Sequence, residues 1–150
     1  MVGVREVFAV KISTRGRYAL RLMMDVALAE GDAPVRIKDI ARRQEISEKY
    51  LEQIVSVLNK AGLVRSSRGP QGGYRLVRAP EEYTAGEIVS SIEGSLAPVA
   101  CLATETNECP RQGACATLRL WEKVDNAIRS VMDSVTLADL IAWQDELEKK

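Results

Sequence analysis

Histidine is absent from this chain of 150 residues, and its absence removes whole classes of chemistry. The chain offers no histidine general base, no Cys–His catalytic pair and no histidine metal ligand. It also lacks the glycine-rich fingerprints of P-loops and dinucleotide-binding folds. These absences argue against an enzyme. The length suffices for one compact core, or for a small core with an oligomerisation element.

Long apolar runs are missing as well. No segment approaches the roughly 20 apolar residues that cross a bilayer, so no membrane partner is expected. The first ten residues, MVGVREVFAV, are too short and too interrupted by charge for a secretory signal. We therefore expect a cytoplasmic protein, in which thiols stay reduced and clustered cysteines more often bind metal than form disulfides.

The formal net charge is zero, but the two halves of the chain differ. Residues 1–78 hold 15 Lys and Arg against 8 Asp and Glu, whereas residues 79–150 hold 6 against 13. A basic first half and an acidic second half suggest a module that meets an acidic partner, joined to a part that does not.

Three helical patterns occupy the first 61 residues. The segment 13–32 predicts a first helix capped by Ser13 or Thr14 and ended by Gly31 and Asp32, and IKDIARRQ predicts a second. The third pattern, EKYLEQIVSVLNKA, follows Ser47 as N-cap. Its apolar residues recur at i, i+3, i+4 and i+7 and so face a core: Leu51, Ile54, Val55 and Leu58.

A β-hairpin with a basic tip is predicted next, because LVRSS and YRLVR alternate in polarity and flank the turn sequence RGPQGG. Helix, helix, tight turn, helix and hairpin is the order of a winged helix-turn-helix, whose third helix enters the major groove of DNA. Residues 35–78 carry ten Lys and Arg against four Asp and Glu, which attracts phosphates. Double-stranded DNA is therefore the expected partner.

The second half predicts further helices around a loop. Thr84 to Glu87 is a T-x-x-E capping box that opens a fourth helix, and T-x-x-D at Thr136 opens the last. Between them a long helix runs from about residue 116 to 132. Its apolar stripe suits pairing with a second copy of the chain, with packing onto its own domain as the alternative. The stripe, interrupted by Asp125, comprises Leu118, Trp121, Ile128, Met132 and Val135.

The expected fold class is mostly α with a small β-hairpin: a winged helix-turn-helix domain plus a long dimerisation helix. The chain then divides into an N-terminal extension (1–10), the DNA-binding domain (11–80), a connecting helix (81–95), a cysteine cluster loop (96–115) and dimerisation helices (116–150).

All three cysteines fall within CLATETNECPRQGAC, residues 101–115. Three thiolates are one ligand short of a closed tetrahedral metal site. The residues alone leave several interpretations open: an iron–sulfur cluster, reversible oxidation of Cys101 or Cys109, or structural zinc held by three thiolates and a carboxylate. A winged domain that binds a protein instead of DNA is a further alternative, which the basic wing disfavours.

From Lys11 onward nearly the whole chain resembles the Rrf-type bacterial transcription regulators. The most specific matches are S-x-K-Y-L-E-Q at Ser47–Gln53 and R-G-P-x-G-G-Y at Arg68–Tyr74. The resemblance implies a homodimer formed through the long helix after the cysteines. It implies recognition-helix side chains that read base edges and a wing that contacts DNA, with these contact residues: Arg15, Arg17, Ser47, Lys49, Tyr50, Glu52, Gln53, Arg68, Gly69, Gln71, Gly72 and Tyr74.

Many members of that family carry three cysteines here as ligands of an iron–sulfur cluster. The resemblance therefore implies a [2Fe-2S] or [4Fe-4S] cluster held by Cys101, Cys109 and Cys115. Two fourth ligands known in the family do not carry over, because the matching positions hold Leu118 and Arg17. The fourth ligand stays open among water, a small-molecule thiol and three carboxylates: Glu6, Glu105 and Glu108.

Overall fold

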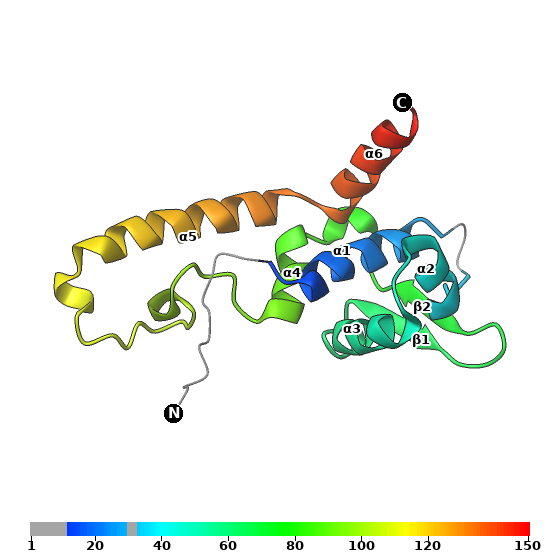
Figure 1. The fold of residues 1–150 in the computed structure, drawn as a ribbon, viewed down its shortest axis with the longest axis horizontal. Helices are drawn as coiled ribbons and strands as arrows, with labels where there is room; N and C mark the ends of the chain where they lie inside the picture. The colour runs from blue at the N-terminus through cyan, green and yellow to red at the C-terminus, as the bar shows by residue number, and fades with distance from the viewer. Residues whose placement is uncertain (1–11, 30–32) are drawn as a thin grey trace.

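The computed structural model describes residues 12–29 and 33–150, so the expected N-terminal extension and Glu6 lie outside the described residues. The fold is mostly helical with one two-stranded hairpin, as the sequence predicts (Figure 1). In chain order the elements are α1 (Thr14–Ala27), α2 (Ile37–Gln44), α3 (Glu48–Lys60), β1 (Val64–Ser67), β2 (Gly73–Leu76), the 3-10 turn η1 (Pro80–Glu82), α4 (Ala85–Glu93), the 3-10 turns η2 (Ala100–Leu102) and η3 (Gln112–Ala114), α5 (Ala116–Ser134) and α6 (Leu137–Glu148).

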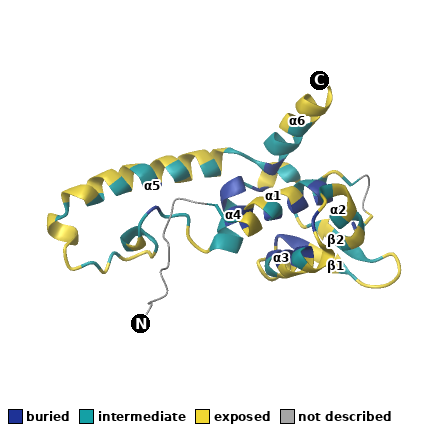
Figure 2. Ribbon diagram, in the orientation of Figure 1, coloured by how far each residue is buried: buried dark blue, intermediate teal, exposed yellow. Residues whose placement is uncertain are grey.

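One hydrophobic core lies among α1, α3 and α4. Ser13 starts α1 as its N-cap, with Oγ accepting the Gly16 N–H at 3.2 Å. The helix ends at Ala27, earlier than the predicted stop at Gly31 and Asp32, with Leu28 as its C-cap and the Ala29 N–H bonding the Val26 carbonyl three residues back. The core takes the predicted face of α3, and Figure 2 shows the buried residues concentrated in these helices. Its fully buried side chains include Leu22, Met23, Ile40, Leu51, Ile54, Leu58 and Ile88.

The turn between α2 and α3 is as tight as predicted. Glu45 adopts a left-handed conformation, φ 55°, and its N–H bonds the Ala41 carbonyl at the end of α2. The exposed Ser47 then caps α3 by accepting the Tyr50 N–H at 3.2 Å. Two residues between the helix end and the next N-cap fix a sharp bend, which is the geometry of a helix-turn-helix.

The hairpin is anchored to the helices at its base. β1 and β2 pair antiparallel, and Tyr74 exchanges two 2.8 Å backbone hydrogen bonds with Val35. Buried Tyr83 donates its hydroxyl to the Leu63 carbonyl at 2.7 Å and accepts the backbone N–H groups of Val77 and Arg78. The wing therefore joins the core through backbone bonds and one buried phenol.

The second half begins with α4, whose Ile88 and Val89 are buried. Thr84 accepts the Glu87 N–H at 3.0 Å, but the Glu87 carboxylate bonds Arg78 at 2.6 Å. The predicted capping box is therefore only half formed, since a neighbouring guanidinium takes the carboxylate. The box at Thr136 is complete, with both hydrogen bonds to Asp139 present.

The molecule is elongated. The hairpin lies at one end, the cysteine segment and the start of α5 lie at the other, and α1 and α4 lie between them (Figure 1). The 19 residues of α5 span about 28 Å at 1.5 Å per residue. Within residues 12–29 and 33–150 no helix meets the length and hydropathy needed to span a bilayer.

Candidate DNA-binding face and cysteine loop

The polar face of α3 is open to a partner. Lys49, Glu52 and Gln53 are all exposed, as a helix that reads base edges requires. Tyr50 is half-buried instead, with its ring edge-on to Tyr18 of α1 at 5.7 Å between centroids. Tyr50 thus packs α3 against α1, and its side chain has less exposed surface available for DNA than those of Lys49, Glu52 and Gln53.

The tip of the wing presents Arg68, Gly69 and Gln71 to solvent. Gly69 has φ 101°, a conformation that favours glycine, and its carbonyl accepts the Gly72 N–H at 2.9 Å. A Cβ at Gly72 would come within 2.8 Å of the same carbonyl oxygen. Gly72 therefore shapes the tight turn, and half-buried Tyr74 anchors the strand behind it.

The first turn of α1 adds two cations. Arg15 and Arg17 are both exposed, and the Arg17 Nη2 donates to Thr14 Oγ1 at 2.9 Å. The turn therefore presents positive charge beside the first backbone N–H groups of the helix, an arrangement that favours phosphate.

Two further arginines lie on the wing but are not among the contact residues predicted from the sequence. Arg65 and Arg75 are cross-strand partners, both exposed, and Arg75 Nη2 donates to Ser67 Oγ at 3.1 Å. Like charges directly opposite one another destabilise a hairpin, so an anion between them would be favourable. The alternation in LVRSS and YRLVR already places both arginines on the outer face, and that signal was sufficient to find them.

The arginines at the N-cap of α2 and within α2 are paired with a carboxylate. Arg36 and Arg42 lie 3.1 and 3.5 Å from the carboxylate of Asp39. The hydrogen bond from Arg36 is the main cause of a lowered pKa for Asp39, and the charges of Arg36, Arg42 and Arg43 add to it. These arginines are thus partly neutralised, unlike the pair on the wing.

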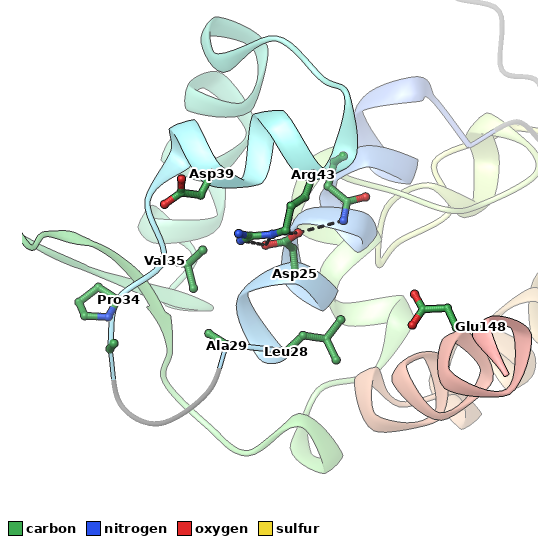
Figure 3. Close-up of a pocket in the computed structure, with 10 residues that line it drawn as sticks. Asp25, Leu28, Ala29, Pro34, Val35, Asp39, Arg43 and Glu148 are labelled. Carbon is green, nitrogen blue, oxygen red and sulfur yellow. Dashed lines mark hydrogen bonds and ion pairs between the residues drawn. The ribbon is translucent and has the colours of Figure 1, made fainter.

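An ion pair between the buried Asp25 and the partly exposed Arg43 joins α1 to α2. Asp25 is 5% exposed and accepts three hydrogen bonds from Arg43, the shortest at 2.5 Å, and one from Gln44 at 3.0 Å (Figure 3). The hydrogen bonds that Arg43 donates to Asp25 raise the pKa of Arg43. This pair lines a hollow of about 570 Å³, which Leu28 and Glu148 also line (Figure 3).

The three cysteines come together in space. Cys101 lies in η2, Cys109 lies in the following loop, and Cys115 is the residue before α5; all are free thiols and partly exposed. They line one hollow of about 120 Å³. The surface that lines it is mostly apolar, although the other lining residues are of both kinds: Val99, Leu118 and Trp121 are apolar, and Asn107, Gln112 and Thr117 are polar.

The local geometry favours the thiolate of Cys115. Its sulfur lies 3.2 Å from the hydroxyl of Thr117, which lowers the pKa of the thiol, and the backbone N–H groups of Leu118 and Thr117 and the charge of Arg111 lower it further. Asn107 supports the middle cysteine, because its Oδ1 accepts the Cys109 N–H at 3.0 Å.

Of the carboxylates considered as a fourth ligand, Glu105 and Glu108 do not line this hollow, and Glu6 lies outside the described residues. Glu108 is exposed, and Glu105 lines a separate space of about 530 Å³ between α4 and α5. Among the described residues, no three Cys, Asp or Glu side chains are grouped closely enough for one metal ion. A single zinc ion needs each ligand about 2.0–2.3 Å from one point, whereas a cluster spreads its thiolates over several irons.

The apolar stripe predicted on α5 is half-buried along its whole length. Leu118 and Trp121 face the cysteine hollow, and Met132 faces the space beside α4. Asp125, which interrupts the stripe, is buried; one of its oxygens accepts Arg129 Nε at 2.9 Å, and the other has no partner among the described residues.

Comparisons with known proteins agree with this architecture. The family model of Rrf2, described as an iron-dependent transcriptional regulator, matches residues 12–143. The HTH-type transcriptional regulator CymR of Bacillus subtilis (strain 168) is 43% identical over 135 residues, which cover 90% of this chain and 92% of CymR.

Two solved structures are similar as well. IscR from T. potens superposes with a TM-score of 0.73 at 42% identity, covering 91% of this chain and 90% of IscR. The oxidized form of Staphylococcus aureus CymR superposes with a TM-score of 0.66 at 40% identity, covering 87% and 95%. These relatives are regulators and not enzymes, and the winged helix-turn-helix fold is confirmed. With a family model that spans most of its length and relatives above 40% identity, the chain belongs to the Rrf2 family of transcription regulators.

Proposed function

We propose that this chain is a cytoplasmic, homodimeric regulator whose operator affinity depends on an iron–sulfur cluster held by Cys101, Cys109 and Cys115. Its family binds DNA, and the exposed cations on α1, α3 and the hairpin form the surface that would meet the duplex. In this proposal Glu52 and Gln53 read base edges, while Arg68 contacts the backbone.

The observation that carries the cluster proposal is the shared hollow. Cysteines up to 14 positions apart in the sequence line one small space with mostly apolar walls. Apolar walls limit access of water, and the partial exposure of each thiol leaves a route for exchange with solvent. A cluster bound there would add a rigid, charged group between η2 and the first turn of α5. Its gain or loss would then move the loop against that helix.

Anaerobic purification with iron and sulfide analysis and an absorption spectrum tests this proposal. We expect iron and acid-labile sulfide in each subunit, with visible absorption that is lost in Cys101→Ser, Cys109→Ser and Cys115→Ser. None of the three cysteines belongs to the hydrophobic core, so helical content should remain in all three variants. Stoichiometric zinc without sulfide, and no reconstitution by iron and sulfide, would refute the cluster.

A second candidate is a thiol switch without a cluster. The lowered pKa of Cys115 and the partial exposure of all three thiols favour oxidation, and one relative has been solved as an oxidized form. Protein that is colourless after anaerobic purification, and whose DNA affinity changes reversibly with peroxide and thiol reductant, would favour this candidate over the cluster.

The proposed dimer would use the outer face of α5. Leu120 and Val131 are its most exposed apolar residues, at 51% and 61%. With Val124 and Ala127 they recur at spacings of four, three and four, which is the spacing of a coiled-coil seam. In an antiparallel pair related by a two-fold axis, Leu120 of each copy would meet Val131 of the other, so the face is self-complementary.

A further inference from the structure

A single carboxylate joins the entrance of the cysteine segment to the start of the DNA-binding unit. Glu93 is the last residue of α4, and the chain turns at Gly94, φ 83°, toward the cysteines. The Glu93 Oε1 accepts the backbone N–H of Ser13 at 2.9 Å and also the Ser13 hydroxyl. Glu93 therefore bonds the N-cap of α1 across 80 positions of sequence.

The contact is built into both helices. Ser13 Oγ accepts the Gly16 N–H, so the carboxylate, the N-cap and the first turn form one chain of hydrogen bonds. A Cβ at Gly16 would lie 2.5 Å from Glu93 Oε1, and only glycine leaves the carboxylate its place. A negative charge at the N-terminus of a helix is also favoured by the helix dipole. We call Glu93, Ser13 and Gly16 the α1–α4 clamp.

The clamp lies between the two functional regions. Figure 1 shows α1 and α4 between the cysteine segment and the hairpin. The turn that the clamp holds carries Arg15 and Arg17, both exposed, and one turn further Tyr18 packs on Tyr50 of α3. A movement at the end of α4 would therefore reach a cationic turn and the anchor of the recognition helix.

We propose that Glu93 is a positioning residue that couples the conformation of the cysteine segment to the DNA-facing first turn of α1. When the segment holds its present form, Glu93 keeps the Ser13 N–H and hydroxyl paired and the turn ordered. When the segment moves and draws the end of α4 with it, these donors lose their acceptor and the turn frays. The proposal rests on the proposed function only for the nature of the switch, because the clamp exists without a cluster.

Amide hydrogen exchange tests the coupling on the reduced, metal-free full-length protein. Iodoacetamide is the perturbation, since it adds an acetamide group to each of three partly exposed thiols that line the same hollow. We expect alkylation to speed exchange at residues 13–17 several-fold in the wild type, with little change at residues 51–58 of α3. In Glu93→Ala these amides should exchange fast before treatment and respond no further.

Two variants separate coupling from simple structural damage. Glu93→Gln keeps an oxygen that accepts the same hydrogen bonds, so it should retain much of the response to alkylation. Glu81→Ala, an exposed carboxylate in η1, should respond like the wild type. If alkylation leaves residues 13–17 of the wild type unchanged, or if both Glu93 variants respond as fully as the wild type, the coupling is refuted.

The outcome is independent of the cluster. A wild type that never binds iron and sulfide refutes the proposed function, yet its exchange response still decides whether the clamp couples the two regions. Where the cluster does load, the ratio of DNA dissociation constants with and without it should approach one in Glu93→Ala, while the absorption spectrum stays that of the wild type. A ratio unchanged from the wild type contradicts the coupling.

Discussion

At the scale of single residues, the ion pair between the buried Asp25 and the partly exposed Arg43 links two helices of the helix-turn-helix. Asp25→Ala removes the acceptor of these charged hydrogen bonds but leaves Arg43, 46% exposed, free to be hydrated, so the free energy of unfolding should fall by about 1.5–3 kcal/mol. Asp39→Ala is the matched control, because Asp39 also pairs with arginines but lies at the surface; its effect should be small. Urea unfolding measures both. Equal, small losses would show that the Asp25–Arg43 pair contributes little.

Cys115 gives a pH-dependent prediction at the same scale. The hydrogen bond with Thr117 lowers the pKa of this thiol, so its thiolate persists to lower pH than that of an ordinary cysteine. The rate of alkylation of Cys115 in metal-free protein should therefore rise with pH at an unusually low midpoint. Thr117→Val should move that midpoint to higher pH, and peptide-resolved mass spectrometry follows each cysteine. An unchanged midpoint in Thr117→Val would remove the hydroxyl as the cause.

Whether the sequence predicts the role of a residue depends on how far along the chain its hydrogen-bond partner lies. The caps Ser47 and Thr136 bond groups three residues on, and local patterns predict them correctly. Asp25 and Glu93 bond partners 18 and 80 positions away, so no local pattern reveals them. The hollow that gathers the cysteines was implied by family resemblance, and its apolar walls emerged only from the fold.

At the scale of elements, the order of helices and hairpin follows from periodicity and turn residues, whereas the orientation of α5 does not. Because α5 has apolar residues on two faces, its apolar periodicity is the same whichever of these faces packs against the rest of the chain. Packing decides: Leu118 and Trp121 cover the cysteine hollow, and the exposed apolar residues are Leu120 and Val131. The dimer stripe predicted from the spacing of Leu118, Trp121 and Ile128 is half-buried in one copy, and the proposed seam uses the neighbouring exposed face instead.

The wing and the recognition helix should make separable contributions to DNA binding. Arg68→Ala should lower the salt slope by about one unit on specific and random duplexes alike. Arg65→Ala and Arg75→Ala should do the same without destabilising the fold, since each relieves a repulsion. Gln53→Ala should relax discrimination at particular base pairs, each worth about 1–3 kcal/mol.

Fluorescence anisotropy with a duplex selected from a random library by the wild type, at several salt concentrations, distinguishes these effects. Arg119→Ala, an exposed arginine on α5, is the control and should bind as the wild type does. If the wing variants retain the full salt slope, the outer face of the hairpin does not meet phosphate.

At the scale of the whole molecule, the position of α5 determines how two DNA-binding units would be held. The helix extends past the core with an unpartnered apolar face, and two recognition helices can read two half-sites only if that face fixes their separation (Figure 1).

Val131→Glu and Leu120→Glu place a charge in the proposed seam, where burial without a partner costs several kcal/mol, so both variants should sediment as monomers at micromolar concentration. Leu147→Glu is the matched control, since Leu147 of α6 is equally apolar and 64% exposed but lies outside the seam; it should remain a dimer. The monomeric variants should keep their helical content and lose affinity for a two-half-site duplex far more than for a single half-site. A dimer that survives Val131→Glu but dissociates in Leu147→Glu would move the interface from α5 to α6.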